Sequence, residues 1–112
     1  PVPPTYQQAL FSITSDDCSK HVNFLASDKL EGRMSGKNGN VLAANYVEAE
    51  FKKYGLETMR DRFSIKRLNP GPKNEVGNDF TENVYAVIPG ETDDIVVVGA
   101  HMDHIGYGPS MS

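Results

Sequence analysis

The sequence lacks several features that would place it in a specialised class of protein. Its 112 residues include one cysteine, Cys18, so no disulfide can form within the chain. No apolar run is long enough to cross a bilayer, so we expect no membrane-spanning segment. The 11 Lys and Arg residues are scattered and the net charge is −4, which argues against nucleic acid as a partner.

The first residues, PVPP, have neither the basic region nor the apolar region of a signal peptide. A processed chain would have lost such a leader, so this absence leaves the compartment undecided. The overall composition of the chain, with 38% hydrophobic and 23% charged residues, is close to the average of globular proteins. A chain of this length has the usual size of one domain with a modest core.

The N-terminal half predicts two helices after an extended arm over residues 1–13. Thr14 and Asp17 fit a capping box at the start of the first helix, which we expect to end near Ala26. Its apolar stripe, read as helix core, is formed by Cys18, Val22 and Leu25.

The second helix is predicted over residues 41–54, with one apolar face and a stop signal directly after it. Gly55 stands where a helix-terminating glycine belongs, and two lysines fall in the last turn. The residues of the apolar face, interpreted as packing residues, are Ala44, Val47, Phe51 and Tyr54.

The C-terminal half predicts strands. Alternation indicates a half-exposed strand over 62–68, a polar loop over 69–82 and another strand over 83–88. Residues 95–98 (IVVV) form an unbroken β-branched run, which is typical of a strand covered on both faces. The fold class is therefore α/β, with N-terminal helices followed by strands of a mixed sheet.

Two polar residues, His101 and Asp103, follow shortly after the 95–98 run. Two residues apart on an extended backbone, their side chains leave the same face and can share one site. A metal-binding imidazole usually donates its second N–H to a carboxylate or carbonyl, so the pair suits a metal ligand and the acid that orients it. An ordinary turn cap beside a hydrogen-bonded histidine explains the same residues, and the spacing alone leaves both interpretations open.

Two motifs, in order, extend the pattern beyond this pair. The first is LASDKLEGR at 25–33, followed by glycines at 36 and 39; the second is NVYAVIPG at 83–90 followed by IVVVGAHMDHIG at 95–106. Together they resemble the N-terminal part of M28 family zinc metallopeptidases over about residues 20–107. The resemblance implies a three-layer α/β/α zinc-exopeptidase fold, with 14–112 as the N-terminal part of the peptidase domain.

The resemblance also implies roles for the pair. His101 matches the first metal ligand of the family, and Asp103 matches the acid that orients it and is counted as catalytic. The family's bridging aspartate, Glu pair and further ligands lie later in its sequences than the point matched by Ser112. The implied cofactor is zinc, with two ions in the complete site, the implied substrate is a peptide, and the implied location is periplasmic or extracellular.

We therefore expect the 112-residue chain to be inactive alone and to self-associate through its apolar strand. Three alternatives stay open: a relative that cyclises glutaminyl residues, a receptor-like relative without metals, and a non-catalytic binding module. His104 is a poor ligand candidate, because it points to the other side of an extended chain. His21 is interpreted as a surface or structural histidine, and Arg33 as an ion-pair former that locks its loop.

Overall fold

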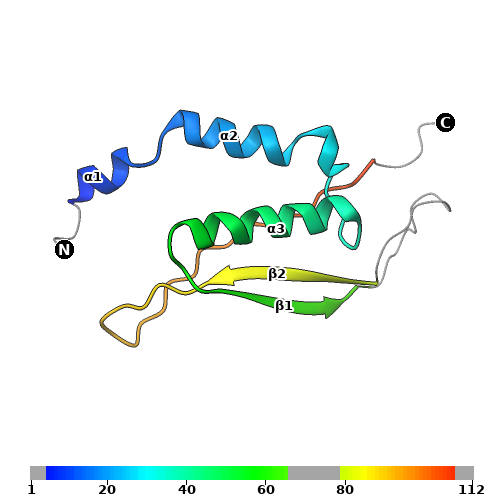
Figure 1. Ribbon diagram of the computed structural model, residues 1–112. Coiled ribbons are helices and arrows are strands. Elements are labelled where there is room, and N and C mark those ends of the chain that lie inside the picture. The colour runs from blue at the N-terminus through cyan, green and yellow to red at the C-terminus, as the bar shows by residue number, and fades with distance from the viewer. Residues whose placement is uncertain (1–4, 66–78, 108–112) are drawn as a thin grey trace.

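The computed structural model describes residues 5–65 and 79–107, which form a small α/β fold (Figure 1). Helix α2 lies over α3, and α3 lies on a two-stranded sheet (Figure 1). The elements are α1 (Tyr6–Phe11), α2 (Ser15–Leu25), the 3-10 turn η1 (Asp28–Leu30), α3 (Asn38–Lys53), β1 (Thr58–Ser64) and β2 (Phe80–Ala86). Within the described ranges, no helix is both long and apolar enough to span a bilayer.

The N-terminal arm is helical, so the prediction of an extended arm is wrong where the structure describes it. A capping box starts α1: the Thr5 hydroxyl accepts from the Gln8 backbone N–H, and the Gln8 side chain accepts from the Thr5 N–H. All residues of α1 are exposed. Local hydrogen bonds therefore make this segment helical. The apolar pattern of the sequence does not reveal such bonds.

The predicted first helix is confirmed as α2. Its N-cap is Thr14, whose hydroxyl oxygen lies 3.1 Å from the Asp17 amide nitrogen, and its C-cap is Ala26. The side facing α3 differs from the prediction, because Phe24 stacks on Tyr46 with ring centroids 4.2 Å apart. Cys18 is exposed as a result, and its assignment to the helix core is wrong.

Helix α3 confirms the predicted second helix, beginning three residues earlier, at Asn38. It ends at Lys53, and Gly55 adopts the predicted left-handed conformation with φ +78°. Ala44 packs as expected, whereas Tyr54 is 71% exposed and is not a packing residue.

The core is small and lies where η1 meets α3. Leu30 is fully buried there, together with Ala43 and Ala44 of α3. A side chain on Gly39 would overlap the Leu30 carbonyl, so glycine at this position lets η1 and α3 approach closely.

Strands β1 and β2 pair antiparallel, with Thr58 opposite Ala86 and Ser64 opposite Phe80. Both strands begin before their predicted starts, β1 at 58 instead of 62 and β2 at 80 instead of 83, inside the predicted loop. Residues 66–78, which held the rest of the predicted strand end and loop, lie outside the described residues. Where the sequence shows no apolar alternation, two arginines of β1 contact Glu82 of β2 across the ladder.

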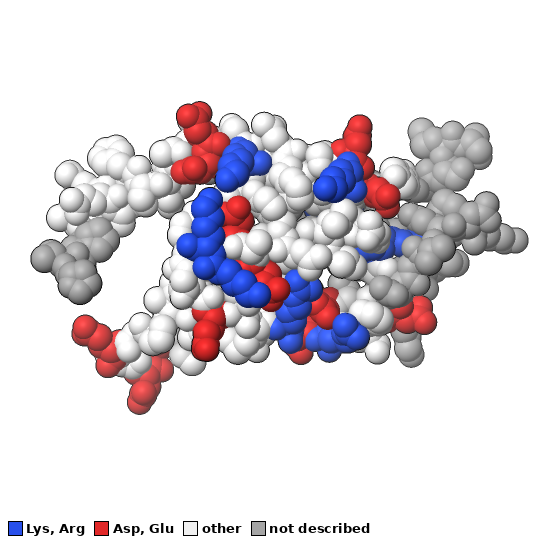
Figure 2. Space-filling model, in the orientation of Figure 1, with Lys and Arg blue, Asp and Glu red and all other residues white. Residues whose placement is uncertain are grey.

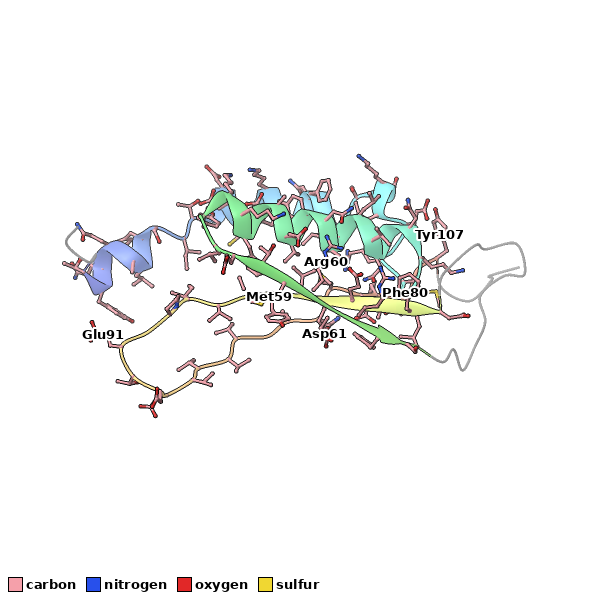
Figure 3. All side chains as sticks on the ribbon, turned by 60° about the horizontal axis from the view of Figure 1, so that its bottom comes forward. Met59, Arg60, Asp61, Phe80, Glu91 and Tyr107 are labelled. Carbon is pink, nitrogen blue, oxygen red and sulfur yellow. The ribbon has the colours of Figure 1, made fainter. Side chains whose placement is uncertain are left out.

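Charged side chains join α3 to the sheet, and Figure 3 shows Arg60 in the space between β1 and α3. The Arg60 guanidinium contacts Glu82 of β2 at 2.9 Å and Glu48 of α3 at 3.2 Å, and donates to Asn45 at 2.7 Å. We call these four residues the Arg60 cluster. Over most of the face in Figure 2, Lys and Arg likewise lie beside Asp and Glu, whereas a small group of acidic side chains at the lower left has no Lys or Arg beside it.

The 95–98 run is not a covered strand. Its side chains are between 84% and 94% exposed, and among the described residues no strand pairs with it. A β-branched run needs packing elements on both faces to be buried, and the described helices and strands supply none here. The prediction of a covered strand over 95–98 is therefore wrong for the described structure.

Candidate functional site

The structure brings His101 and Asp103 into contact. The His101 Nδ1 atom lies 3.3 Å from the Asp103 Oδ1 atom and 3.0 Å from the Asp103 carbonyl oxygen. The two side chains are 82% and 50% exposed. The predicted proximity of the pair is thus observed, at a site open to solvent.

The contact has a chemical consequence for the imidazole. When the Asp103 carboxyl is ionised, its Oδ1 atom and its carbonyl oxygen are both hydrogen-bond acceptors. A neutral imidazole can donate to them only if its proton is on Nδ1. In that tautomer the lone pair is on Nε2. The nitrogen turned away from Asp103 is therefore the one suited to bind a metal ion.

Asp103 has a second partner, Ser35, which sequence reasoning did not single out. The Ser35 hydroxyl donates to the Asp103 Oδ2 atom at 3.1 Å, across 68 positions of sequence. One carboxylate oxygen thus faces the imidazole and the other faces the hydroxyl. In the sequence, the one feature that pointed to Ser35 was its position two residues after the LEGR motif.

The backbone near Asp103 is tied to the same loop. The amide of His104 donates to the Arg33 carbonyl at 3.0 Å, and the amide of Gly106 donates to the Gly32 carbonyl at 3.0 Å. The Arg33 Nε donates to the Met102 carbonyl at 3.0 Å. We call residues 32–35 the LEGR-end loop and residues 101–106 the HMDHIG segment.

Arg33 does lock its loop, but by a different interaction from the predicted ion pair. Its guanidinium donates to two backbone carbonyls, those of Met102 and Leu25, and forms no ion pair within residues 5–65 and 79–107. A planar group with several donors can bridge two carbonyls that a single ammonium would not reach together. The side chain therefore joins the end of α2 to the HMDHIG segment.

The backbone is unusual where the chain enters the LEGR-end loop. Glu31, directly before the loop, and Gly32 and Arg33 within it all have positive φ, at 51°, 74° and 50°. This conformation is unfavourable for the two residues that carry side chains. A side chain on Gly32 would also overlap the Gly106 carbonyl, so glycine permits the close approach of the two segments.

A broad groove of about 1010 Å³ includes the candidate site among its walls. Mainly apolar side chains of α2, α3 and the sheet line it, together with residues 97–103. A smaller hollow of about 240 Å³ lies over the sheet beside Arg60. The donors of Arg60 already contact Glu48, Glu82 and Asn45, so this second hollow is no candidate anion site.

The other histidines have different surroundings. The Nδ1 atom of His21 lies 2.6 Å from the Tyr46 hydroxyl, which confirms a structural role between α2 and α3. Burial, with a smaller effect of Glu50, raises the pKa of Tyr46, so the phenol stays protonated at neutral pH. The His104 side chain is exposed, and its backbone amide holds the Arg33 carbonyl.

A zinc ion held by protein alone needs three or four ligands. His101, with a carboxylate on its other nitrogen, fits one ligand of such a site. The described ranges contain no group of three or more His, Cys, Asp or Glu residues that could complete it. No family model matches the chain, and neither a curated protein nor a solved structure matches it.

Proposed function

We propose that this chain is the N-terminal part of a zinc aminopeptidase of the M28 type, which removes N-terminal residues from peptides. The observation that supports this most is the contact between His101 Nδ1 and Asp103, which leaves Nε2 for a metal ion. Two zinc ions in the complete site would supply a polarised water as the nucleophile. His101 would hold one of them, and Asp103 would orient the imidazole.

The three-layer α/β/α architecture is part of the same proposal. In it, residues 95–98 form a central strand covered on both faces by elements other than those described. The apolar groove and the 84–94% exposed run are surfaces on which such elements would pack.

Zinc titration of the 112-residue chain tests the ligand assignment. The three histidines are followed by the nitrogen chemical shifts of their rings, so His21 and His104 act as internal controls. We expect Nε2 of His101 to respond at the lowest zinc concentration, and His101→Ala to abolish that response while His104→Ala preserves it. A first response at His104 or His21, or none at any ring, would reject the assignment.

Activity gives a second test. The chain alone should release no N-terminal residue from a chromogenic peptide with added zinc, because one matched ligand cannot clamp two ions. In the complete protein, Asp103→Asn should weaken zinc affinity or turnover by roughly 10- to 100-fold, the usual cost of losing such an orienting partner. Zinc-dependent turnover by the 112-residue chain that disappears in His101→Ala would contradict the expected inactivity and would indicate a site completed by another chain.

The exposed 95–98 run favours a second candidate function, a non-catalytic interaction module. A module of this kind would be a stable monomer that unfolds cooperatively, and its His101 would show no preference for zinc. Light scattering together with the zinc titration separates the two candidates.

A further inference from the structure

Ser35, Asp103 and His101 form a continuous chain of polar contacts. The Ser35 hydroxyl reaches Oδ2 of Asp103 at 3.1 Å, and Oδ1 of the same carboxylate lies 3.3 Å from Nδ1 of His101. We propose that Ser35 is a positioning residue that acts on His101 through Asp103. This role depends on the proposed function in one respect, the assignment of His101 as a metal ligand.

The carboxylate needs such support because it is half exposed. An exposed contact between a carboxylate and an imidazole contributes little by itself, since water competes for both partners and the side chains must be ordered. The Asp103 side chain is 50% exposed, so without Ser35 its oxygens are free to turn away from the imidazole. A hydroxyl bonded to Oδ2 restricts that rotation and keeps Oδ1 beside Nδ1.

The backbone contacts keep Ser35 within reach of Asp103. Residues 102, 104 and 106 each bond to the loop at Gly32 or Arg33, so both sides of Asp103 are fixed relative to Ser35. The loop does this in a conformation with three successive positive φ values, which persists only when surrounding contacts hold it. The two motifs, about 70 positions apart, thus form one structural unit.

The tautomer of His101 reports this role without any metal. Ring-nitrogen NMR at alkaline pH, where histidines are neutral, measures the ratio of the Nδ1–H form to the Nε2–H form. We expect Ser35→Ala to lower this ratio by about 2- to 5-fold, as part of one hydrogen bond is lost. The Asp103 carbonyl, 3.0 Å from Nδ1, remains in the variant and keeps the change partial.

Two variants serve as controls for a general loss of stability. Ser35→Thr keeps a hydroxyl and should restore the ratio. Ser12→Ala removes a serine whose hydroxyl bonds only the nearby Ala9 carbonyl, and should leave the ratio unchanged. An unchanged ratio in Ser35→Ala, or an equal change in Ser12→Ala, would overturn the proposal.

Asp103→Asn tests the same role if Ser35→Ala does not fold. With Ser35 present, its hydroxyl favours the amide oxygen and turns the NH₂ group toward Nδ1, which should shift the ring toward the Nε2–H form. Persistence of the original ratio in Asp103→Asn would overturn the proposal. All samples are free of metal, so the outcome is independent of whether the zinc assignment holds.

Discussion

The Arg33 Nε atom lies 3.0 Å from the carbonyl oxygen of Met102, a residue 69 positions later in the chain. The same side chain also donates to the Leu25 carbonyl at the end of α2. One guanidinium therefore joins the end of the first long helix to the segment that carries His101 and Asp103.

Arg33→Lys should loosen the HMDHIG segment, because an ammonium cannot bridge both carbonyls. The amides of His104 and Gly106 bond to the LEGR-end loop, so their hydrogen exchange should accelerate by about 5- to 10-fold, as expected for about one hydrogen bond. Exchange measured by NMR checks this. Arg62→Lys, an exposed arginine of β1, is the matched control, and equal acceleration in both variants would contradict the specific role.

Gly39→Ala should destabilise the chain although Gly39 is in a helix. Replacing a helical glycine by alanine normally stabilises by about 0.5–1 kcal/mol. Here the added carbon would overlap the Leu30 carbonyl, so we expect a loss of about 1–3 kcal/mol from overpacking. Denaturant unfolding measures the difference. Gly90→Ala, at a glycine with open space around it, is the control and should change stability little.

Acid should weaken the attachment of α3 to the sheet. Hydrogen bonds from Arg60 and then Thr58 lower the pKa of Glu48, and hydrogen bonds from Arg60 and then Arg62 lower the pKa of Glu82. Both values fall below the ordinary 4.5, so the folded state binds fewer protons than the unfolded state near that pH. The contribution of the Arg60 cluster is present above about pH 4.5 and is lost as pH falls below it.

Arg60→Gln gives the comparison for this pH dependence. Its destabilisation should be largest at pH 7 and should shrink as the pH falls below about 4.5, because the unfolded state then binds protons on both carboxylates and the contribution of Arg60 is progressively lost. Unfolding curves at several pH values measure it. A constant difference between the variant and the unchanged chain over that range would show that Arg60 acts by packing and not by charge.

The 112-residue chain should self-associate through residues 95–98. Their apolar side chains are exposed, and no strand in the described part of the chain pairs with them, so they offer a surface for another chain. Val97→Asp should weaken association by about tenfold or more, since burying a valine is worth about 1.5–3 kcal/mol. Light scattering over a concentration series checks this. Val87→Asp, at an exposed valine outside the run, is the control, and a monomer at all concentrations would count against the prediction.

The sequence by itself determined the local features of this protein. The Thr14 cap, the presence of α3 and the left-handed Gly55 follow from residues close together in the chain and were predicted correctly, although α3 begins three residues before its predicted start. The proximity of His101 and Asp103 also followed from their two-residue spacing. Such features depend on backbone preferences and side-chain spacing that neighbouring residues set without help from the rest of the fold.

Tertiary structure decided which faces are covered and which distant groups meet. Cys18 of α2 and Tyr54 at the end of α3 fit apolar stripes yet are exposed. On α2, Phe24 faces α3 instead and stacks on Tyr46. Both strands are longer than their apolar alternation predicts, and Glu82 contacts two arginines across the ladder. The contact of Ser35 with Asp103 depends on loops 68 positions apart, and no pattern in the sequence states how such segments pack in space.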